Sequence, residues 1–124
     1  MIRKDYIQRY FDELAKVLAA ALLLKKNHKA TEAEAMLNDF STDFLGISLA
    51  EILTLEVDLI KYLIKEKNFT LDHFKLLEDL LYHKYLINVS NNKLKKITLE
   101  VLNYVSKNDA NYSLQRMNRI KELS

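Results

Sequence analysis

Cysteine and proline are absent from this chain of 124 residues, and glycine occurs once, at Gly46. Without cysteine the chain has no disulfide framework, no thiolate nucleophile and no thiolate metal site. Without proline helices can continue uninterrupted, and a single glycine cannot build a glycine-rich phosphate loop. Because Leu, Lys, Glu, Ala and Ile account for more than half of the residues, the composition predicts an all-α protein.

Long apolar runs are missing as well. The longest, residues 17–24, lies between Lys16 and Lys25 and is far shorter than the ~20 residues that a membrane-spanning helix needs. Residues 1–5 lead into a charged stretch instead of the apolar core of a secretion signal. We therefore expect a cytoplasmic protein without a membrane-spanning segment.

Apolar residues recur at three- and four-residue spacing in successive segments of the chain. The short connections between these segments force each helix to lie antiparallel to the one before it. The sequence predicts a single domain of three helical hairpins, with five to six helices in all, over residues 5–46, 48–88 and 90–124. Around Thr54 apolar and polar residues alternate, and since no partner strand exists, we expect a break there with Thr54 capping a new helix.

Capping residues agree with these boundaries. Gly46 is expected to end the second helix, because glycine takes the left-handed conformation at low cost. Capping boxes are expected at Thr31 with Glu34 and at Ser48 with Glu51, and single caps at Thr70 and at Ser90 or Asn91. The last helix is expected to begin near Asn111.

The dipeptide Lys-Asn closes a helical stretch at three positions. Asparagine can take the left-handed conformation that ends a helix, so each dipeptide predicts an equivalent turn. The asparagines are 41 and then 40 residues apart: Lys26-Asn27, Lys67-Asn68 and Lys107-Asn108. A period near 40 favours three stacked hairpins in a short right-handed solenoid. A compact helical bundle is the alternative.

In this architecture the chain resembles tetratricopeptide-like helical hairpin repeat proteins. The Trp and Pro positions of that family's motif have no counterpart, since the chain contains neither residue. A second resemblance covers about the first fifty residues. The segments Asp5-Tyr6-Ile7-Gln8-Arg9 and Phe44-Leu45-Gly46-Ile47 look like an uncharacterised family of small helical bacterial proteins, which implies a bacterial cytoplasmic protein with no assigned chemistry.

The sequence offers no set of metal ligands. Its three histidines are His28, His73 and His83. His28 is expected in a turn, and His73 and His83 fall on different helical faces. Asp79 and His83 lie one turn apart and could share a ligand, but two ligands are too few for zinc. We expect no metal and no cofactor.

A catalytic site is equally absent from the pattern. No carboxylate stands alone inside an apolar stripe, where its pKa would rise. The acids considered are expected on exposed helical faces: Glu13, Glu32, Glu34, Glu51, Glu78 and Asp79. With no nucleophile elbow possible either, the sequence predicts a protein that is not an enzyme.

Seven tyrosines suggest a contact surface, because tyrosine provides a large contact area at low entropic cost. Boundary residues with apolar rings and wet hydroxyls are the alternative interpretation. We expect the first and third helices to bind a partner peptide, a partner helix or a second copy. The candidate partner-binding residues are Tyr6, Arg9, Tyr10, Glu13, Lys61, Tyr62 and Lys65. A homodimer is also expected to use the apolar flank at Leu22, Leu23 and Leu24.

A basic C-terminal third gives the alternative function, an accessory protein that binds nucleic acid. Residues 88–124 carry 7 basic and 3 acidic side chains, whereas residues 1–87 carry 12 and 14. Lys93 with Lys96, and Arg116 with Arg119, are one turn apart and are the candidate phosphate contacts. The surplus is modest and no helix-turn-helix signature is present, so a protein interaction module is the leading hypothesis.

Overall fold

The structure, a computed structural model, describes the backbone of residues 2–124 and the side chains of residues 6–124. Every regular element in these residues is helical, which confirms the all-α prediction. No helix among them is long and apolar enough to cross a bilayer. The elements are α1 (Ile2–Lys26), α2 (Ala30–Phe40), the π-helical turn η1 (Ser41–Leu45), α3 (Leu49–Thr54), α4 (Leu59–Glu66), α5 (Leu71–Ile87), α6 (Asn92–Asn108) and α7 (Leu114–Leu123).

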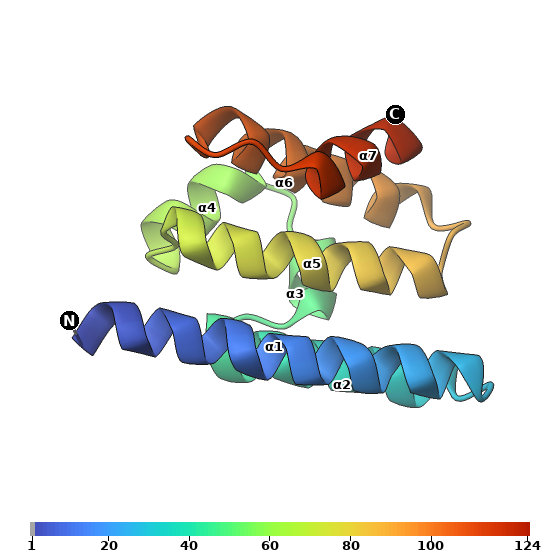
Figure 1. Cartoon of the computed structure of the whole chain (residues 1–124). Coiled ribbons are helices and arrows are strands. Elements are labelled where there is room, and N and C mark those ends of the chain that lie inside the picture. Colours follow the sequence, from blue (N-terminus) through green and yellow to red (C-terminus); the bar gives the residue numbers. More distant parts are fainter. Residues whose placement is uncertain (1) are drawn as a thin grey trace.

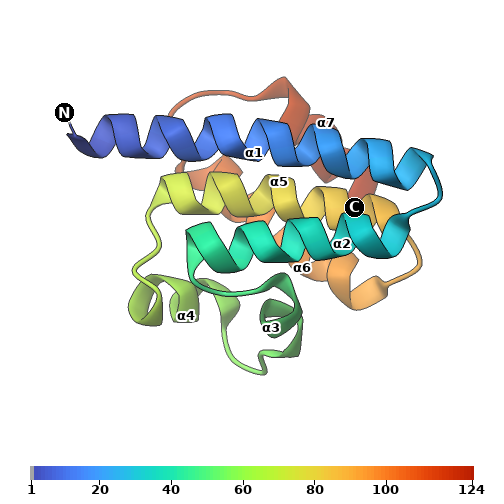
Figure 2. The same ribbon diagram turned by 90° about the horizontal axis from the view of Figure 1, so that it is seen from below.

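The helices form three layers around α5 (Figure 1). Helices α1 and α2 pack as an antiparallel pair in one outer layer, and α6 and α7 form the opposite outer layer. The middle layer contains α5, with the short helices α3 and α4 beside it (Figure 2). Because α5 contacts α1, α2, η1 and α6, it is the centre of a bundle of helical hairpins.

The second predicted hairpin, residues 48–88, is less regular than expected. The break near Thr54 is confirmed, but its cap is Asp58: the Asp58 carboxylate accepts a hydrogen bond from the backbone N–H of Lys61 at 3.2 Å. The Thr54 hydroxyl instead donates to the Glu51 carbonyl at 2.8 Å, in the last turn of α3. The short helices α3 and α4 therefore form the first arm of this hairpin, and a regular solenoid is not confirmed.

The three Lys-Asn turns end helices as predicted, but they are not equivalent. After α1 the left-handed residue is His28, with φ +63°, and not Asn27. The N–H of Lys29 reaches back to the Leu24 carbonyl at 2.8 Å, which closes a Schellman motif around His28. Asn68 is left-handed with φ +56°, whereas α6 ends in extended backbone at Asp109.

The start and end of the second helix differ in how well the sequence predicted them. The expected box of Thr31 and Glu34 is not formed, because α2 begins two residues earlier, with Lys29 and not Thr31 in the N-cap position. Glu34 instead accepts a hydrogen bond from the Asn88 side chain. The predicted end at Gly46 is confirmed, with φ +75°.

Most of the remaining caps agree with the sequence. Ser48 and Glu51 form the expected capping box, Thr70 caps α5, and Asn91 rather than Ser90 caps α6. Helix α7 begins later than Asn111, because Ser113 is its cap and accepts from the Arg116 N–H at 3.2 Å.

Helix α5 is buried around most of its circumference. Apolar residues on several of its faces are almost fully removed from solvent: Phe74, Leu76, Leu77, Leu80, Leu81 and Tyr85. Each such side chain contributes about 1.5–3 kcal/mol through burial. Neighbouring helices must therefore cover α5 on all of these faces.

The polar face of α5 is covered by α7. Glu78 is only 5% exposed and receives two hydrogen bonds from the Arg116 guanidinium, at 2.7 Å and 2.8 Å. Arg116 also pairs with Asp109 at 3.3 Å, and Lys75 pairs with the same Asp109 oxygen at 3.3 Å. The prediction that Glu78 lies on an exposed face is wrong, because α7 packs over that face.

A second set of polar contacts continues along the same helix pair. The Arg119 guanidinium donates to the Asp79 carboxylate at 2.6 Å and lies 4.2 Å from the centre of the Tyr82 ring. The Tyr82 hydroxyl donates to Glu122 at 2.7 Å. Charge-assisted hydrogen bonds and a cation–π contact therefore supply much of the attachment of α7 to α5.

His83 lies on another side of α5, against α1. Its neighbours include Ala21, Leu22 and Lys25 of α1. Burial lowers the pKa of His83, and the positive charge of Arg119 lowers it further. Asp79, one turn before His83 on the same helix, binds Arg119 through its carboxylate.

Replacing Arg116 with Met should leave the Glu78 carboxylate buried without its guanidinium. We expect the free energy of unfolding to fall by about 3 kcal/mol, as for other broken buried ion pairs. Urea denaturation followed by circular dichroism measures this change.

As a control, Lys16→Met removes an exposed pair with Glu13, which should change the free energy of unfolding by less than about 0.5 kcal/mol. In the double variant Glu78→Leu/Arg116→Met we expect most of the lost stability to return, because no charge is left unpaired. Equal losses for Arg116→Met and Lys16→Met would contradict the buried pair.

The lowered pKa of His83 predicts a pH dependence of stability. The unfolded chain binds a proton at His83 near the ordinary pKa of 6.5, whereas the folded chain binds it only at lower pH. The contribution of neutral His83 to the free energy of unfolding is therefore fully present above about pH 6.5 and decreases as the pH falls below this value. We expect urea denaturation between about pH 7 and pH 5 to show this decrease, and His83→Gln to reduce it. The same pH dependence in both proteins would disprove the assignment.

Candidate binding groove

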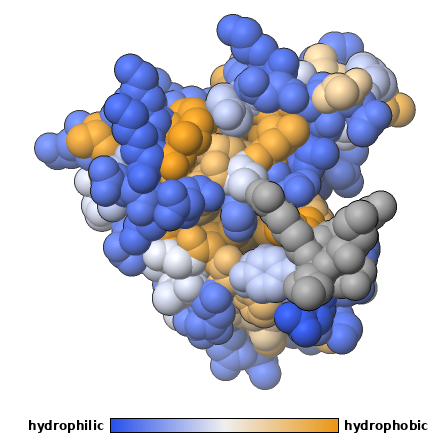
Figure 3. Space-filling view, turned by 90° about the vertical axis from the view of Figure 1, so that its left-hand side faces the viewer, coloured by the Kyte–Doolittle hydropathy of each residue, from blue (hydrophilic) through white to orange (hydrophobic). Residues whose placement is uncertain are grey.

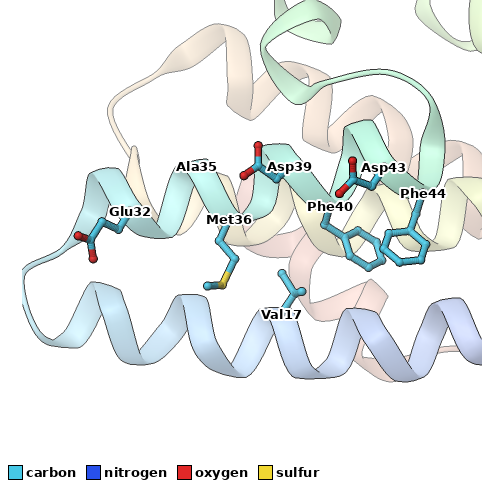
Figure 4. Close-up of a pocket in the computed structure, with 8 residues that line it drawn as sticks. All are labelled: Val17, Glu32, Ala35, Met36, Asp39, Phe40, Asp43 and Phe44. Carbon is cyan, nitrogen blue, oxygen red and sulfur yellow. The ribbon is translucent and has the colours of Figure 1, made fainter.

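An open groove of about 420 Å³ runs between α1 and the α2–η1 segment. Its floor is apolar: Val17 points up from α1, and Met36 and Phe40 point toward it from α2 (Figure 4). The lining residues are Val17, Glu32, Ala35, Met36, Asp39, Phe40, Asp43 and Phe44. The two helices pack closely along their length, so this groove is an outer seam of a packed pair and not an internal cavity.

Aromatic rings close one end of the groove. Phe40 and Phe44 stack with ring centres 4.4 Å apart and an interplanar angle of 22°. Tyr10 of α1 meets Phe44 edge-on at 4.7 Å, and Tyr6 lies 4.3 Å from Tyr10. Burial raises the pKa of Tyr10 to about 12, and its hydrogen bond to the Tyr6 hydroxyl also raises it, so the phenol stays protonated. Phe40 and Phe44 contribute shape and apolar area to the groove, and Tyr10 packs against Phe44 from outside the lining.

The π-helical turn η1 determines where Phe44 lies. Its geometry is held after Gly46 by the buried Ser41 hydroxyl, which donates to the Ile47 carbonyl at 2.6 Å. The Thr42 hydroxyl donates to the Asn38 carbonyl at 3.1 Å, in the last turn of α2. Single π-helical turns are rare, and those inside α-helices occur frequently at functional sites.

Three exposed carboxylates line the outer edge of the groove: Glu32, Asp39 and Asp43. They are seven and four residues apart, which places them in one stripe along α2 and η1. Figure 4 shows Asp39 and Asp43 on the side of the helix away from α1. In the described part of the chain none of the three makes an ion pair, and no cation lines the groove.

The structure separates the predicted partner-binding residues into two groups. Tyr6 and Tyr10 lie at the aromatic end of the groove, and Arg9 and Glu13 are on the same helix. Glu13 pairs with Lys16 at 3.3 Å.

The second group lies on α4. Lys61, Tyr62 and Lys65 surround a smaller hollow of about 210 Å³ with Val57, Asp58 and Glu66. Figure 2 shows α4 on the far side of α2 from α1, so the two groups do not form one surface.

On the face at the end of the molecule where α1 begins, hydrophobic side chains lie among hydrophilic ones (Figure 3).

The predicted phosphate contacts are also divided. Lys93 and Lys96 are exposed on α6. Arg116 and Arg119 are only 8% and 9% exposed, and both pair with carboxylates of α5. The prediction of two exposed basic faces is therefore wrong for α7, because its arginines are used to attach it to α5.

The sequence interpretation missed most of the groove. In the structure Phe40 and Phe44 face α1, but the apolar spacing of the sequence did not show that Phe44 stays partly exposed there. A usable signal was present in the sequence. The acidic stripe at 32, 39 and 43 lies directly beside an apolar stripe at 36, 40 and 44.

No group of three or more His, Asp or Glu side chains in the described residues is arranged to hold a metal ion. His28 lies in a turn, and the Nδ1 atom of His73 accepts a hydrogen bond from the Thr70 N–H at 3.0 Å. No protein-family model, curated protein or solved structure matches this chain. Both resemblances drawn from the sequence therefore stay predictions, and functional inference depends on the groove between α1 and α2.

Proposed function

We propose that this protein is a cytoplasmic, non-enzymatic interaction module that binds a helix or peptide of a partner protein in the α1–α2 groove. The observation that supports this proposal is the combination in one open groove of an apolar floor, an aromatic end and a charged edge. Ligand sites of this type are mostly apolar, with a few polar groups that fix orientation.

The dimensions of the groove suit a helical ligand. Its lining extends from residue 32 to residue 44, which at roughly 1.5 Å per residue is about 18 Å along the helix axis. A partner helix of about three turns has this length. Amphipathic helices bind apolar grooves through anchors at i, i+3, i+4 and i+7, and Met36, Phe40 and Phe44 offer apolar contacts over this length.

The composition of the lining favours contact over chemistry. It includes carboxylates but no Ser, Thr, His, Lys or Tyr side chain. A nucleophile with a neighbouring base, the usual basis of covalent catalysis, is therefore not among the residues that line it.

A second copy of the chain is a further candidate partner, and one observation supports it. Leu22 and Leu23 are 45% and 60% exposed on α1. Light scattering would test this mode, since a dimer should have twice the 14.6 kDa mass of the chain and should dissociate in the variant Leu22→Lys/Leu23→Lys. A monomer at all concentrations would exclude it.

Peptide binding should depend on Ala35, an exposed alanine in the groove lining. We expect peptides selected from a displayed random library to share helical apolar spacing and to bind Ala35→Arg at least about tenfold more weakly, because the long side chain occupies the groove. Fluorescence anisotropy with the selected peptides measures this loss.

Ala19→Arg is the matched control, since Ala19 is an exposed alanine of α1 outside the groove lining. Arginine has high helix propensity, so both variants should remain folded. Equal binding to the Ala35→Arg and Ala19→Arg proteins would rule out the groove as the binding site.

A further inference from the structure

We infer that the occupant of the groove is a cationic amphipathic helix, with an apolar stripe on the floor and basic side chains along the edge formed by α2. This inference rests on the proposed function and adds the chemical class of the partner. It is carried by the charge of the groove edge and by its position relative to the apolar floor.

The charge of the edge has a single sign. Glu32, Asp39 and Asp43 are exposed, and none is neutralised by a cation among the described side chains. The remaining carboxylate of α2 is paired: Glu34, outside the groove lining, lies 3.7 Å from the Lys84 ammonium. The groove therefore contains three negative charges that an incoming partner can pair with.

The α1 side of the groove does not share this charge. Val17 is the α1 residue in the lining, and Glu13, one turn before it, already pairs with Lys16. The negative charge is confined to the α2 edge. A partner helix consequently needs its basic residues on one flank only, beside its apolar stripe.

The spacing of the carboxylates fixes the expected pattern of basic residues. Intervals of seven and four residues correspond to about 10 Å and 6 Å along α2. A partner helix that runs parallel to α2 would match them with Lys or Arg at i, i+7 and i+11. One that runs antiparallel would match them with Lys or Arg at i, i+4 and i+11.

The apolar stripe sets the complementary requirement. Met36, Phe40 and Phe44 are each four residues apart, and the acidic stripe lies on average roughly 80° around the helix from them. The partner's basic flank must have a similar angular offset from its own apolar stripe. An amphipathic helix with lysines bordering its leucines has this arrangement.

Synthetic peptides of about 16 residues test the inference, long enough to cover the whole stripe. Four peptides share the same leucine positions. Two of them carry Lys on the flank, one in the parallel and one in the antiparallel pattern. The third carries Gln at the flank positions, and the fourth carries Glu there. Fluorescence anisotropy is measured at about 0.05 M and 0.5 M salt with the wild type, Asp39→Asn/Asp43→Asn and Ala35→Arg.

The better of the two Lys peptides should bind the wild type on the order of tenfold more tightly than the Gln peptide, since each exposed charge pair changes affinity by roughly 1.5- to 5-fold. The Glu peptide should bind most weakly. The advantage of Lys should shrink in high salt and in Asp39→Asn/Asp43→Asn. The favoured Lys pattern also gives the direction of the bound helix.

A matched control distinguishes the effect of the carboxylates at the groove edge from the effect of the protein's net charge. Glu56→Gln/Glu66→Gln removes two exposed carboxylates outside the groove and should leave the Lys advantage unchanged. Equal effects of the two double variants would overturn the inference, because attraction would then follow net charge alone.

Two other outcomes distinguish this inference from the proposed function. If the Gln or Glu peptide binds as tightly as the Lys peptides and Ala35→Arg abolishes binding, the groove binds helices and the cationic class is wrong. If no peptide binds in a way that depends on Ala35, the proposed function fails, and the inference fails with it.

Discussion

The nearly complete burial of α5 is the constraint on which the other elements depend. A helix with apolar residues on several faces must be covered on all of them, and any charge on it then needs a partner inside the protein. Glu78 meets this need through its two hydrogen bonds with Arg116. Asp79 meets it through Arg119. These pairs join α7 to α5, while α7 also packs against α6, and they leave the two C-terminal arginines only 8% and 9% exposed.

The same constraint explains where a free apolar surface remains. Helices α1 and α2 cover α5 from one side, and each uses part of its surface for that purpose. On the side of the α1–α2 pair away from α5, no other helix of the described chain packs against the groove, so Met36 and Phe44 remain partly exposed there. The hydrogen bond of Ser41 to the Ile47 carbonyl fixes the turn at the end of this seam. The groove is thus a consequence of how the central helix is covered.

Sequence reasoning succeeded where the signal was local. Caps such as Ser48 and Asn91 depend on residues three positions away, and the glycine at position 46 permits a left-handed end wherever it occurs. It failed where the partner is distant: Arg116 meets Glu78 across 38 residues, and nothing near either one reveals the pair. The acidic stripe was visible as a pattern. Its meaning depended on α1 lying beside α2 while the far side of the seam stays open, which only the three-dimensional arrangement shows.

The distribution of exposed charge has a consequence for how a partner would arrive. Carboxylates without ion-pair partners lie on α2 in one outer layer, whereas the exposed lysines 93 and 96 lie on α6 in the opposite layer (Figure 1). The two groups of charges create local electrostatic fields of opposite sign on opposite sides of the molecule. A positively charged partner that comes within a Debye length of about 10 Å of the α2 carboxylates is attracted toward them. Productive collisions would then become more frequent, while the lifetime of the bound complex is still set by the apolar floor.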